Sequence, residues 1–248
     1  MRKLSKSGEQ KNASSTFSAV GRSVKHESAE MHVTGKAIYT DDQLETAGQL
    51  HAAVGMATIA SGHIKTMDLS AVKTAPGVVA VITLDDVIGH TDIGAVFPGD
   101  PILTKDDIEF YGQAIFAVAA TSYELAKKAI ALAKIDYLES TPILTIEQAL
   151  AKQSFVRPPH TMKRGNSETA IKKAKHQLKG SLAIGGQEHF YLEGQVASVI
   201  PTEDGGMMVY SSSQHPAEVQ KLVAEVLAIS FNRVVVDMKR MGGGFGGK

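Results

Sequence analysis

An apolar strand, a helix and a second strand follow one another between residues 113 and 138, and this order constrains the fold more than any other feature. Gln113–Ala120 is an apolar run typical of a buried strand. Thr121-Ser122-Tyr123-Glu124 has the spacing of a capping box, which predicts a helix running to about Lys134. Ile135–Leu138 predicts another strand. The succession indicates a compact α/β unit in which a sheet packs against helices.

Further strands and helices are predicted on both sides of this unit. The upstream strands are Leu50–Met56, His63–Leu69 and Val78–Ile82. Downstream, the sequence predicts a hairpin of residues 195–200 and 207–210, a helix over 216–228 and a strand over 233–238. The apolar face of this helix is formed by Val219, Leu222, Val223, Val226 and Leu227. Between the two groups, Pro142 and Arg157-Pro158-Pro159 predict a linker over residues 141–160.

The composition is that of an ordinary folded protein. At ~150 residues per domain, the 248 residues correspond to one large domain or two small ones. The 26 Lys and Arg residues balance the 26 Asp and Glu residues, which argues against nucleic acid or an anionic membrane as the main partner. The sequence has no cysteine, so this chain supplies no disulfide, thiolate nucleophile, zinc–thiolate site or iron–sulfur ligand.

The N-terminal residues differ from this average. The first 25 residues carry six basic residues and one acidic residue, with almost no apolar periodicity. They predict a basic, flexible arm over residues 1–31, most simply a solvated terminus. Residues 1–10 lack the apolar stretch of a signal peptide, and no run approaches ~18 apolar residues. We therefore expect a cytoplasmic protein without a membrane span.

A glycine-rich segment, Gly242–Lys248, follows the last predicted strand and places five glycines around Phe245. Because no side chain shields them, the backbone N–H groups of such a loop can approach a ligand and bind anionic oxygens. The segment formally matches G-x-x-x-x-G-K and G-x-G-x-x-G, but neither match has the helix that a nucleotide site needs. A flexible glycine tail stays an alternative.

Two more polar segments are candidate sites. Gln214 lies between a predicted strand and a helix start, where it could donate to an oxo or carbonyl group, or serve only as a strand-end or cap residue. The segment 185–193 combines two carboxylates and a histidine with aromatic residues. There, Glu188 and Glu193 are expected to be structural carboxylates rather than an acid/base pair, and His189 lacks metal-ligand spacing to another histidine.

Seven segments, taken together and in this order, carry a family resemblance: Thr34–Asp42, Ala75–Thr83, Tyr111–Gln113, Val118–Ala120, Gly186–Glu193, Ser212–Gln214 and Arg240–Lys248. They resemble the molybdenum-cofactor-binding large subunit of the xanthine dehydrogenase and aldehyde oxidase family. The bacterial enzymes with separate subunits are the most similar, especially through Phe97–Pro101 and Gly185–Gln195. The resemblance reaches almost the whole chain.

The resemblance implies an α+β fold with three parts after the arm. These are an α/β hammerhead domain at residues 32–140, a linker at 141–160 and the start of a mixed α/β molybdopterin-binding domain at 161–248. It implies that Gln214 hydrogen-bonds an oxygen ligand of molybdenum. It also implies that Gly243, Gly244, Phe245 and Gly246 pack their backbone amides against the ligands of the metal and against the pterin. Gln214 and Phe245 would thus contact the ligands of the metal and not the metal itself.

The resemblance also implies an activity, which is the oxidation of purines, hypoxanthine and xanthine to urate, or of aldehydes, with water-derived oxygen at molybdenum. Electrons would leave through the 2Fe-2S clusters and FAD of partner subunits to NAD, in a hetero-oligomer. The family's catalytic glutamate falls beyond Lys248, so no catalytic residue is assigned, and the chain is expected to be the front part of a longer subunit, inactive alone. The alternatives are a non-catalytic assembly module that keeps only the hammerhead domain, and a nucleotide-binding protein that uses residues 242–248.

Overall fold

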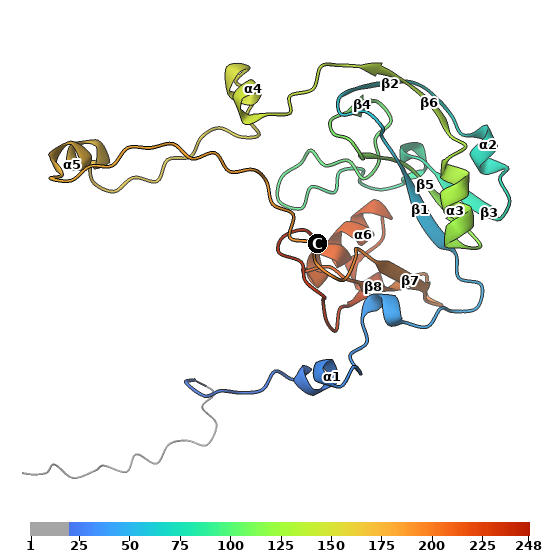
Figure 1. Ribbon diagram of the computed structural model, residues 1–248. Coiled ribbons are helices and arrows are strands. Elements are labelled where there is room, and N and C mark those ends of the chain that lie inside the picture. The colour runs from blue at the N-terminus through green and yellow to red at the C-terminus, as the bar shows by residue number, and fades with distance from the viewer. Residues whose placement is uncertain (1–19) are drawn as a thin grey trace, which may run out of the picture.

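The computed structural model describes residues 20–248 (Figure 1). Exposed residues come first, followed by the short helix α1 (Ala29–Val33) and the 3-10 turn η1 (Thr40–Asp42). Most of the basic arm predicted for residues 1–31 lies outside the described residues. Its last residues are helical, and the Met31 carbonyl accepts hydrogen bonds from the backbone N–H groups of Lys36 and Ala37 at 2.9 and 3.1 Å. Within the described residues, an arm would therefore end before Ala29.

Two antiparallel sheets form the first folded region, residues 51–139. Their strand orders are β1-β5-β3 and β4-β2-β6. The strands are β1 (His51–Met56), β2 (Gly62–Asp68), β3 (Val78–Ile82), β4 (Asp107–Ile108), β5 (Ala114–Ala120) and β6 (Lys134–Glu139). The strand predicted to be buried, β5, lies at the centre of its sheet, with Ala53 and Val81 opposite Val118. The two sheets lie side by side and share one core (Figure 1).

Apolar side chains from both sheets and from α2 (Ser70–Lys73) and α3 (Tyr123–Ile130) form the main core. Its largest fully buried side chains are Phe116, Ile115, Val72 and Val118. Helix α3 contributes two buried alanines, which allow the helix to lie close to the sheet. After β3, the chain passes through the 3-10 turn η2 (Leu84–Asp86) into a long loop that ends at β4.

Helix α3 is shorter than the sequence predicts. It ends at Ile130 and not near Lys134, because Lys134 is already the first residue of β6 and pairs with Asp68 of β2. The helix begins one residue later than the Thr121–Glu124 spacing predicts, because Ser122 is the N-cap and its Oγ accepts a hydrogen bond from Leu125 N at 3.3 Å. The reciprocal half of the capping box is not formed, because Leu125 has no side-chain acceptor.

A largely exposed segment connects the two folded regions and carries α4 (Ile146–Ala151) and α5 (Ser167–Lys173). Figure 1 shows both helices extending away from the folded regions. Helix α4 lies within the linker predicted for residues 141–160. Helix α5 was not predicted, because its sequence lacks an apolar period.

The second folded region is a small sheet of order β7-β8-β9 with one helix. Its elements are β7 (Ala197–Pro201), β8 (Met207–Ser211), α6 (Pro216–Val226), the turn η3 (Phe231–Arg233) and β9 (Val234–Asp237). The hairpin β7–β8 is the predicted one, and β9 runs parallel to β8 through the α6 crossover. The core is Val209, Ala224 and Val234, with Val219 and Val223 packed against it. Helix α6 ends two residues before the predicted Ala228, which has a positive φ of 53°.

A loop of the first region docks on the end of α6. The backbone N–H groups of Gly89 and His90 donate to the carbonyls of Val226 and Glu225, at 3.0 and 2.9 Å. These carbonyls belong to the last turn of the helix, where Glu225 O also accepts a hydrogen bond from Ala228 N at 3.3 Å. The contact joins the first region to the second at the C-terminal end of α6. Within residues 20–248, no helix is both long and apolar enough to cross a membrane.

Candidate functional site

The glycine-rich segment is a folded loop and not a free tail. Gly247 N donates to Gly244 O at 2.8 Å, which closes a tight turn around Phe245. Phe245 has a φ of 54°, a left-handed conformation that a non-glycine residue rarely adopts. Gly243, two residues before it, and Gly246, directly after it, also have positive φ, 102° and 93°. The loop therefore needs glycines at both sides of Phe245.

Gln214 fixes this loop from the β8–α6 connection. Its Oε1 accepts hydrogen bonds from the backbone N–H groups of Gly246, at 2.6 Å, and Lys248, at 3.4 Å. A Cβ at position 244 would lie 2.7 Å from the Gln214 side chain, so this approach requires glycine. Because the oxygen faces the loop, the amide group Nε2 faces away from it, and it donates no hydrogen bond within residues 20–248.

The helix-cap alternative for Gln214 is wrong, because the next residue fills that role. His215 Nδ1 accepts a hydrogen bond from Glu218 N at 3.2 Å and caps α6. Pro216 occupies the first helical position, as predicted. Gln214 is thus free of the helix and bound only to the loop.

Three successive N–H groups of the loop have no hydrogen-bond acceptor in the described part of the chain, those of Gly243, Gly244 and Phe245. Gly244 is buried, and an unpaired buried N–H group is costly. The Phe245 side chain is 67% exposed, and its ring stacks on that of His189 at 5.4 Å and 13°. The structure thus presents a cluster of neutral donors beside an exposed aromatic ring.

The segment 191–195 holds the other side of the loop. Gln195 Nε2 donates to Gly247 O at 2.8 Å, and Tyr191 OH donates to the same oxygen at 3.3 Å. Glu193 Oε2 accepts from Gly242 N at 2.7 Å and lies 3.0 Å from Lys248 Nζ. Sequence reasoning missed the roles of Tyr191, Gln195 and Lys248, although the density of polar and aromatic residues marked the segment.

Glu188 and Glu193 are both structural carboxylates. Glu188 Oε1 accepts a hydrogen bond from the nearby Phe190 N at 3.2 Å and is exposed, whereas the side chain of Glu193 is only 7% exposed. His189 contacts the ring of Phe245 and belongs to no group of three or more His, Asp or Glu side chains that could hold a metal ion within residues 20–248. That these residues form no acid/base pair and no metal site stays a prediction from the sequence.

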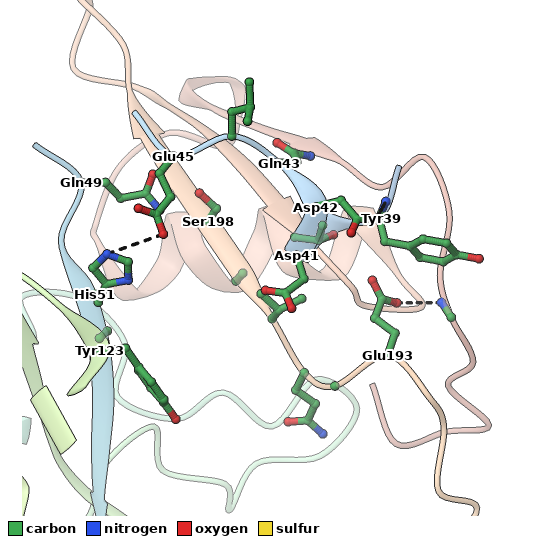
Figure 2. A pocket seen from close by; sticks show the side chains of 18 of the residues that line it. Tyr39, Asp41, Asp42, Gln43, Glu45, Gln49, His51, Tyr123, Glu193 and Ser198 are labelled. Atoms are coloured by element: carbon green, nitrogen blue, oxygen red, sulfur yellow. Dashed lines mark hydrogen bonds and ion pairs between the residues drawn. The ribbon is translucent and has the colours of Figure 1, made fainter. Parts of the chain in front are cut away.

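A cleft of about 1250 Å³ lies beside this site, between the segment 39–52, Tyr123 and the segment 192–198 (Figure 2). Its lining residues include the acidic Asp41, Asp42, Glu45 and Glu193. Three of these have partners: Asp42 accepts from Tyr39 N at 2.9 Å, Glu45 lies 3.8 Å from His51 Nε2, and Glu193 pairs with Lys248. Gln214 and Phe245 do not line the cleft. A negatively charged wall repels an anionic ligand, so the donor cluster and the cleft are separate features.

Comparison with known proteins gives two family matches. Residues 34–141 match the aldehyde oxidase and xanthine dehydrogenase a/b hammerhead domain, and residues 149–248 match the molybdopterin cofactor-binding domain. The chain is 39% identical over 232 residues to xanthine dehydrogenase of Drosophila pseudoobscura pseudoobscura and 41% identical over 230 residues to aldehyde oxidase 3 of Rattus norvegicus. Each alignment covers 92% of this chain and 17% of the relative. The chain belongs to the xanthine dehydrogenase and aldehyde oxidase family.

Solved structures agree with this assignment. Aldehyde oxidoreductase from Desulfovibrio gigas superposes with a TM-score of 0.76 at 29% identity, over 89% of this chain and 26% of that one. The enzyme from Desulfovibrio desulfuricans gives a TM-score of 0.78 at 26% identity, over 91% of this chain and 27% of the other. The predicted family and the predicted α+β fold, a hammerhead domain followed by the start of a molybdopterin-binding domain, are confirmed. The chain spans about a sixth of the length of these curated relatives.

The residues of the loop fit the cofactor of this family. A molybdenum–pterin cofactor presents oxygen and other electron-rich ligands, which need hydrogen-bond donors. Within residues 20–248, the loop offers three unpaired N–H groups, and Gln214 adds an unpaired amide. The close approach at Gly244 leaves no room for a side chain. The Glu193 carboxylate, which would repel such ligands, is turned into the protein interior, where Oε1 is buried.

Proposed function

We propose that this chain contributes the hammerhead domain and the first part of the molybdopterin-binding domain of a molybdenum hydroxylase, divided at residues 32–140, 141–160 and 161–248. We further propose that Gln214 and the loop residues 243–246 contact the cofactor. The observation that carries the proposal is the set of neutral donors at Gly243, Gly244, Phe245 and Gln214, which have no partner within residues 20–248. Preorganised neutral donors stabilise charge that develops on an oxygen atom, and the donors keep their protons as they do so.

Each of these residues has a distinct part in the proposal. Gln214 would donate from Nε2 to an oxygen ligand of the metal, and its orientation is fixed because Oε1 accepts from Gly246 N. The N–H groups of Gly243 to Phe245 would bind the other ligands of the metal and the pterin. The Phe245 ring, held against His189, would shield this place from water. The cofactor, when bound, would supply the redox chemistry, and no residue of this chain is assigned as the catalytic base.

For the substrate, we propose a purine of the hypoxanthine and xanthine class. Electrons would pass to 2Fe-2S and FAD centres in partner subunits of a hetero-oligomer. The similarity to insect xanthine dehydrogenases supports this choice. An aldehyde is the second candidate, because rat aldehyde oxidase 3 and the D. gigas aldehyde oxidoreductase are similar to the chain as well. The cytoplasmic location stays a prediction from the sequence.

The cofactor proposal is tested by titrating the ¹⁵N-labelled chain with molybdopterin cofactor released anaerobically from a family enzyme. We expect weak binding, because the chain holds only part of the cofactor's contacts, with chemical-shift changes at the amides of Gly243, Gly244 and Phe245 and at the Gln214 side chain. Gln214→Glu keeps the oxygen that accepts from Gly246 N but removes the amide donor, and it should weaken binding. Shift changes confined to the acidic cleft, or none at all, would contradict the proposal and favour a non-catalytic assembly module.

The substrate proposal is tested in an enzyme assembled from this chain, the remaining segments of a family large subunit and the redox partners. Turnover with xanthine is compared with turnover of an aromatic aldehyde under the same conditions. A kcat/KM at least about 10-fold higher for xanthine, equal to about 1.4 kcal/mol in the barrier, would support a purine substrate. The reverse order would favour the aldehyde.

A further inference from the structure

Both ends of the glycine-rich loop meet at one oxygen atom. Glu193 Oε2 accepts a hydrogen bond from the Gly242 backbone N–H at 2.7 Å and pairs with the Lys248 ammonium at 3.0 Å. Glu193 stands 49 and 55 residues away from these partners in the sequence. One carboxylate therefore fixes the first and the last residue of the loop relative to each other.

This ion pair is buried. The side chains of Lys248 and Glu193 are 1% and 7% exposed, and Lys248 Nζ also lies 4.8 Å from the centre of the Tyr191 ring. The second oxygen of Glu193, Oε1, is buried without a partner in the described part of the chain. Burying two charges costs desolvation energy that often cancels their attraction, and an unpaired buried oxygen adds to the cost. Stabilisation of the folded chain therefore explains the buried Glu193–Lys248 pair poorly.

We propose that Glu193 and Lys248 are positioning residues that close the loop 242–248 into the shape that presents the N–H groups of Gly243, Gly244 and Phe245. This inference rests on the proposed function, in which the loop 242–248 binds the cofactor. The pair bonds to the loop and to no strand of the β7-β8-β9 sheet, whose core is Val209, Ala224 and Val234. Loss of the pair should thus open the loop and leave the sheet folded.

Amide hydrogen exchange on the 248-residue chain, without cofactor, tests the closure. The probes are the N–H groups of Gly246 and Gly247, which bond to Gln214 and Gly244 and not to the pair itself. Glu193→Gln keeps an acceptor for Gly242 N but removes the charge, and Lys248→Met removes the ammonium. Each should accelerate exchange at both probes by about 10-fold to 100-fold, because bonds between charged groups are among the stronger hydrogen bonds.

Four comparisons separate positioning from simple stabilisation. Exchange of the buried Val209 amide should not change in either variant. The double variant should exchange no faster than the faster single variant, because the two residues act through one shared interaction. Lys248→Arg, which keeps the cation, should retain the protection, and Glu188→Gln, an exposed glutamate of the same segment, should behave as the unmodified chain.

Unchanged exchange at Gly246 and Gly247 in both single variants would overturn the inference, as would equal acceleration at Val209 or additive effects in the double variant. These readouts need no cofactor, so the closure can hold even where the titration with molybdopterin finds no binding and the proposed function fails. Where the cofactor binds, Glu193→Gln should also weaken its binding by about 10-fold, the lower value expected for the lost charge–charge bond. Unchanged binding to an opened loop would show that the loop shape does not position the cofactor.

Discussion

The two folded regions are held together by different forces. The hammerhead region has a core of twelve buried residues from two sheets and two helices. The second region has three such residues, and its glycine-rich loop is held by Gln214, Gln195 and Glu193 through hydrogen bonds and one ion pair. The hydrophobic effect does not depend on the direction of a group, whereas a hydrogen bond fixes that direction. The first region therefore supplies stability, and the second supplies oriented donors.

The largest effect that this comparison predicts is on the stability of the hammerhead core. Phe116 is 1% exposed, and its ring fills the space beside Gly55, where a Cβ would lie 2.2 Å from the ring. Phe116→Ala should lower the free energy of unfolding by about 3–5 kcal/mol, since it loses buried area and leaves a cavity. Urea denaturation followed by circular dichroism measures this change.

The control for Phe116 is an apolar residue of the second region. Val199 lies on β7 and is 51% exposed, so Val199→Ala should change the free energy of unfolding by less than about 0.5 kcal/mol. The fraction of the loop 242–248 in its closed form, read from Gly246 exchange under native conditions, should stay the same in both variants. A loss in Phe116→Ala as small as that in Val199→Ala would contradict this difference between the two regions.

The next effect is on turnover and not on stability. In an assembled enzyme that contains this chain, Gln214→Ala should lower kcat by about 10²–10³, the usual cost of removing one donor to a charged oxygen. Molybdenum content should be largely kept, because the N–H groups of Gly243 to Phe245 remain. Gln214 is exposed and belongs to neither apolar core, so the free energy of unfolding should hardly change.

Gln214→Glu refines this prediction, because it keeps the acceptor for Gly246 N and removes only the donor. It should reduce turnover as Gln214→Ala does, while Gly246 exchange stays slow. Normal turnover of Gln214→Ala with both xanthine and an aldehyde would mean that Gln214 serves only to hold the loop. The proposed place of the metal's ligands beside Gln214 would then be wrong.

The same contrast explains how much of the fold could be predicted from the sequence. Strand β3 has the predicted bounds, and β5 and the β7–β8 hairpin differ from them by a few residues, because apolar runs between turn residues are local signals. The two-residue strand β4 is too short to show alternation, and α5 is too exposed to show an apolar face. Which strands pair depends on contacts far apart in the sequence, so the order β1-β5-β3 could not be derived locally.

For the candidate site, the sequence marked the segments but not their partners. Gln214, Phe245 and the cluster around Glu193 were recognised from residue type and family resemblance. The bond between Gln214 and Gly246 spans 32 residues, and the Glu193–Lys248 pair spans 55. No periodicity links positions at such separations. The expected flexible glycine tail was therefore the natural alternative until the contacts of the loop were known.

A smaller effect should appear where the two regions touch. A Cβ at Gly89 would lie 2.0 Å from the carbonyl oxygen of Glu225, at the end of α6. Gly89→Ala should push the docking loop off the helix, at a cost of about 1–3 kcal/mol typical of overpacking. Hydrogen exchange should accelerate in the last turn of α6 and at Gly89 and His90, and not at the buried Val118 of the hammerhead core.

Gly185→Ala is the matched control, because no atom lies within 4 Å of the Cβ that it adds. It should leave the exchange of α6 unchanged. Equal exchange in Gly89→Ala and the unmodified chain would show that the two regions are joined elsewhere. Arg240 joins the second region to the segment before β1, because its Nη1 donates to Ile38 O at 2.8 Å.

The smallest effect is a pH dependence of the loop between η2 and β4. This loop belongs to the hammerhead region, but oriented hydrogen bonds hold it, as they hold the glycine-rich loop of the second region. Backbone N–H groups of Gly94 and Gly99 donate to the Asp92 carboxylate at 2.8 and 2.7 Å and lower its pKa below the ordinary value of 3.8. Because the pKa of Asp92 is lower in the folded loop than its ordinary value, the charged carboxylate stabilises the folded loop. This stabilisation is present above pH 3.8 and is lost as the pH falls through the lower pKa of the folded loop. The Gly94 and Gly99 amide shifts should therefore titrate with a midpoint below 3.8, and Asp92→Asn, which keeps acceptors but cannot ionise, should remove this titration. A midpoint at or above 3.8 would mean that these bonds do not favour the carboxylate, and that this loop is held by packing like the rest of its region.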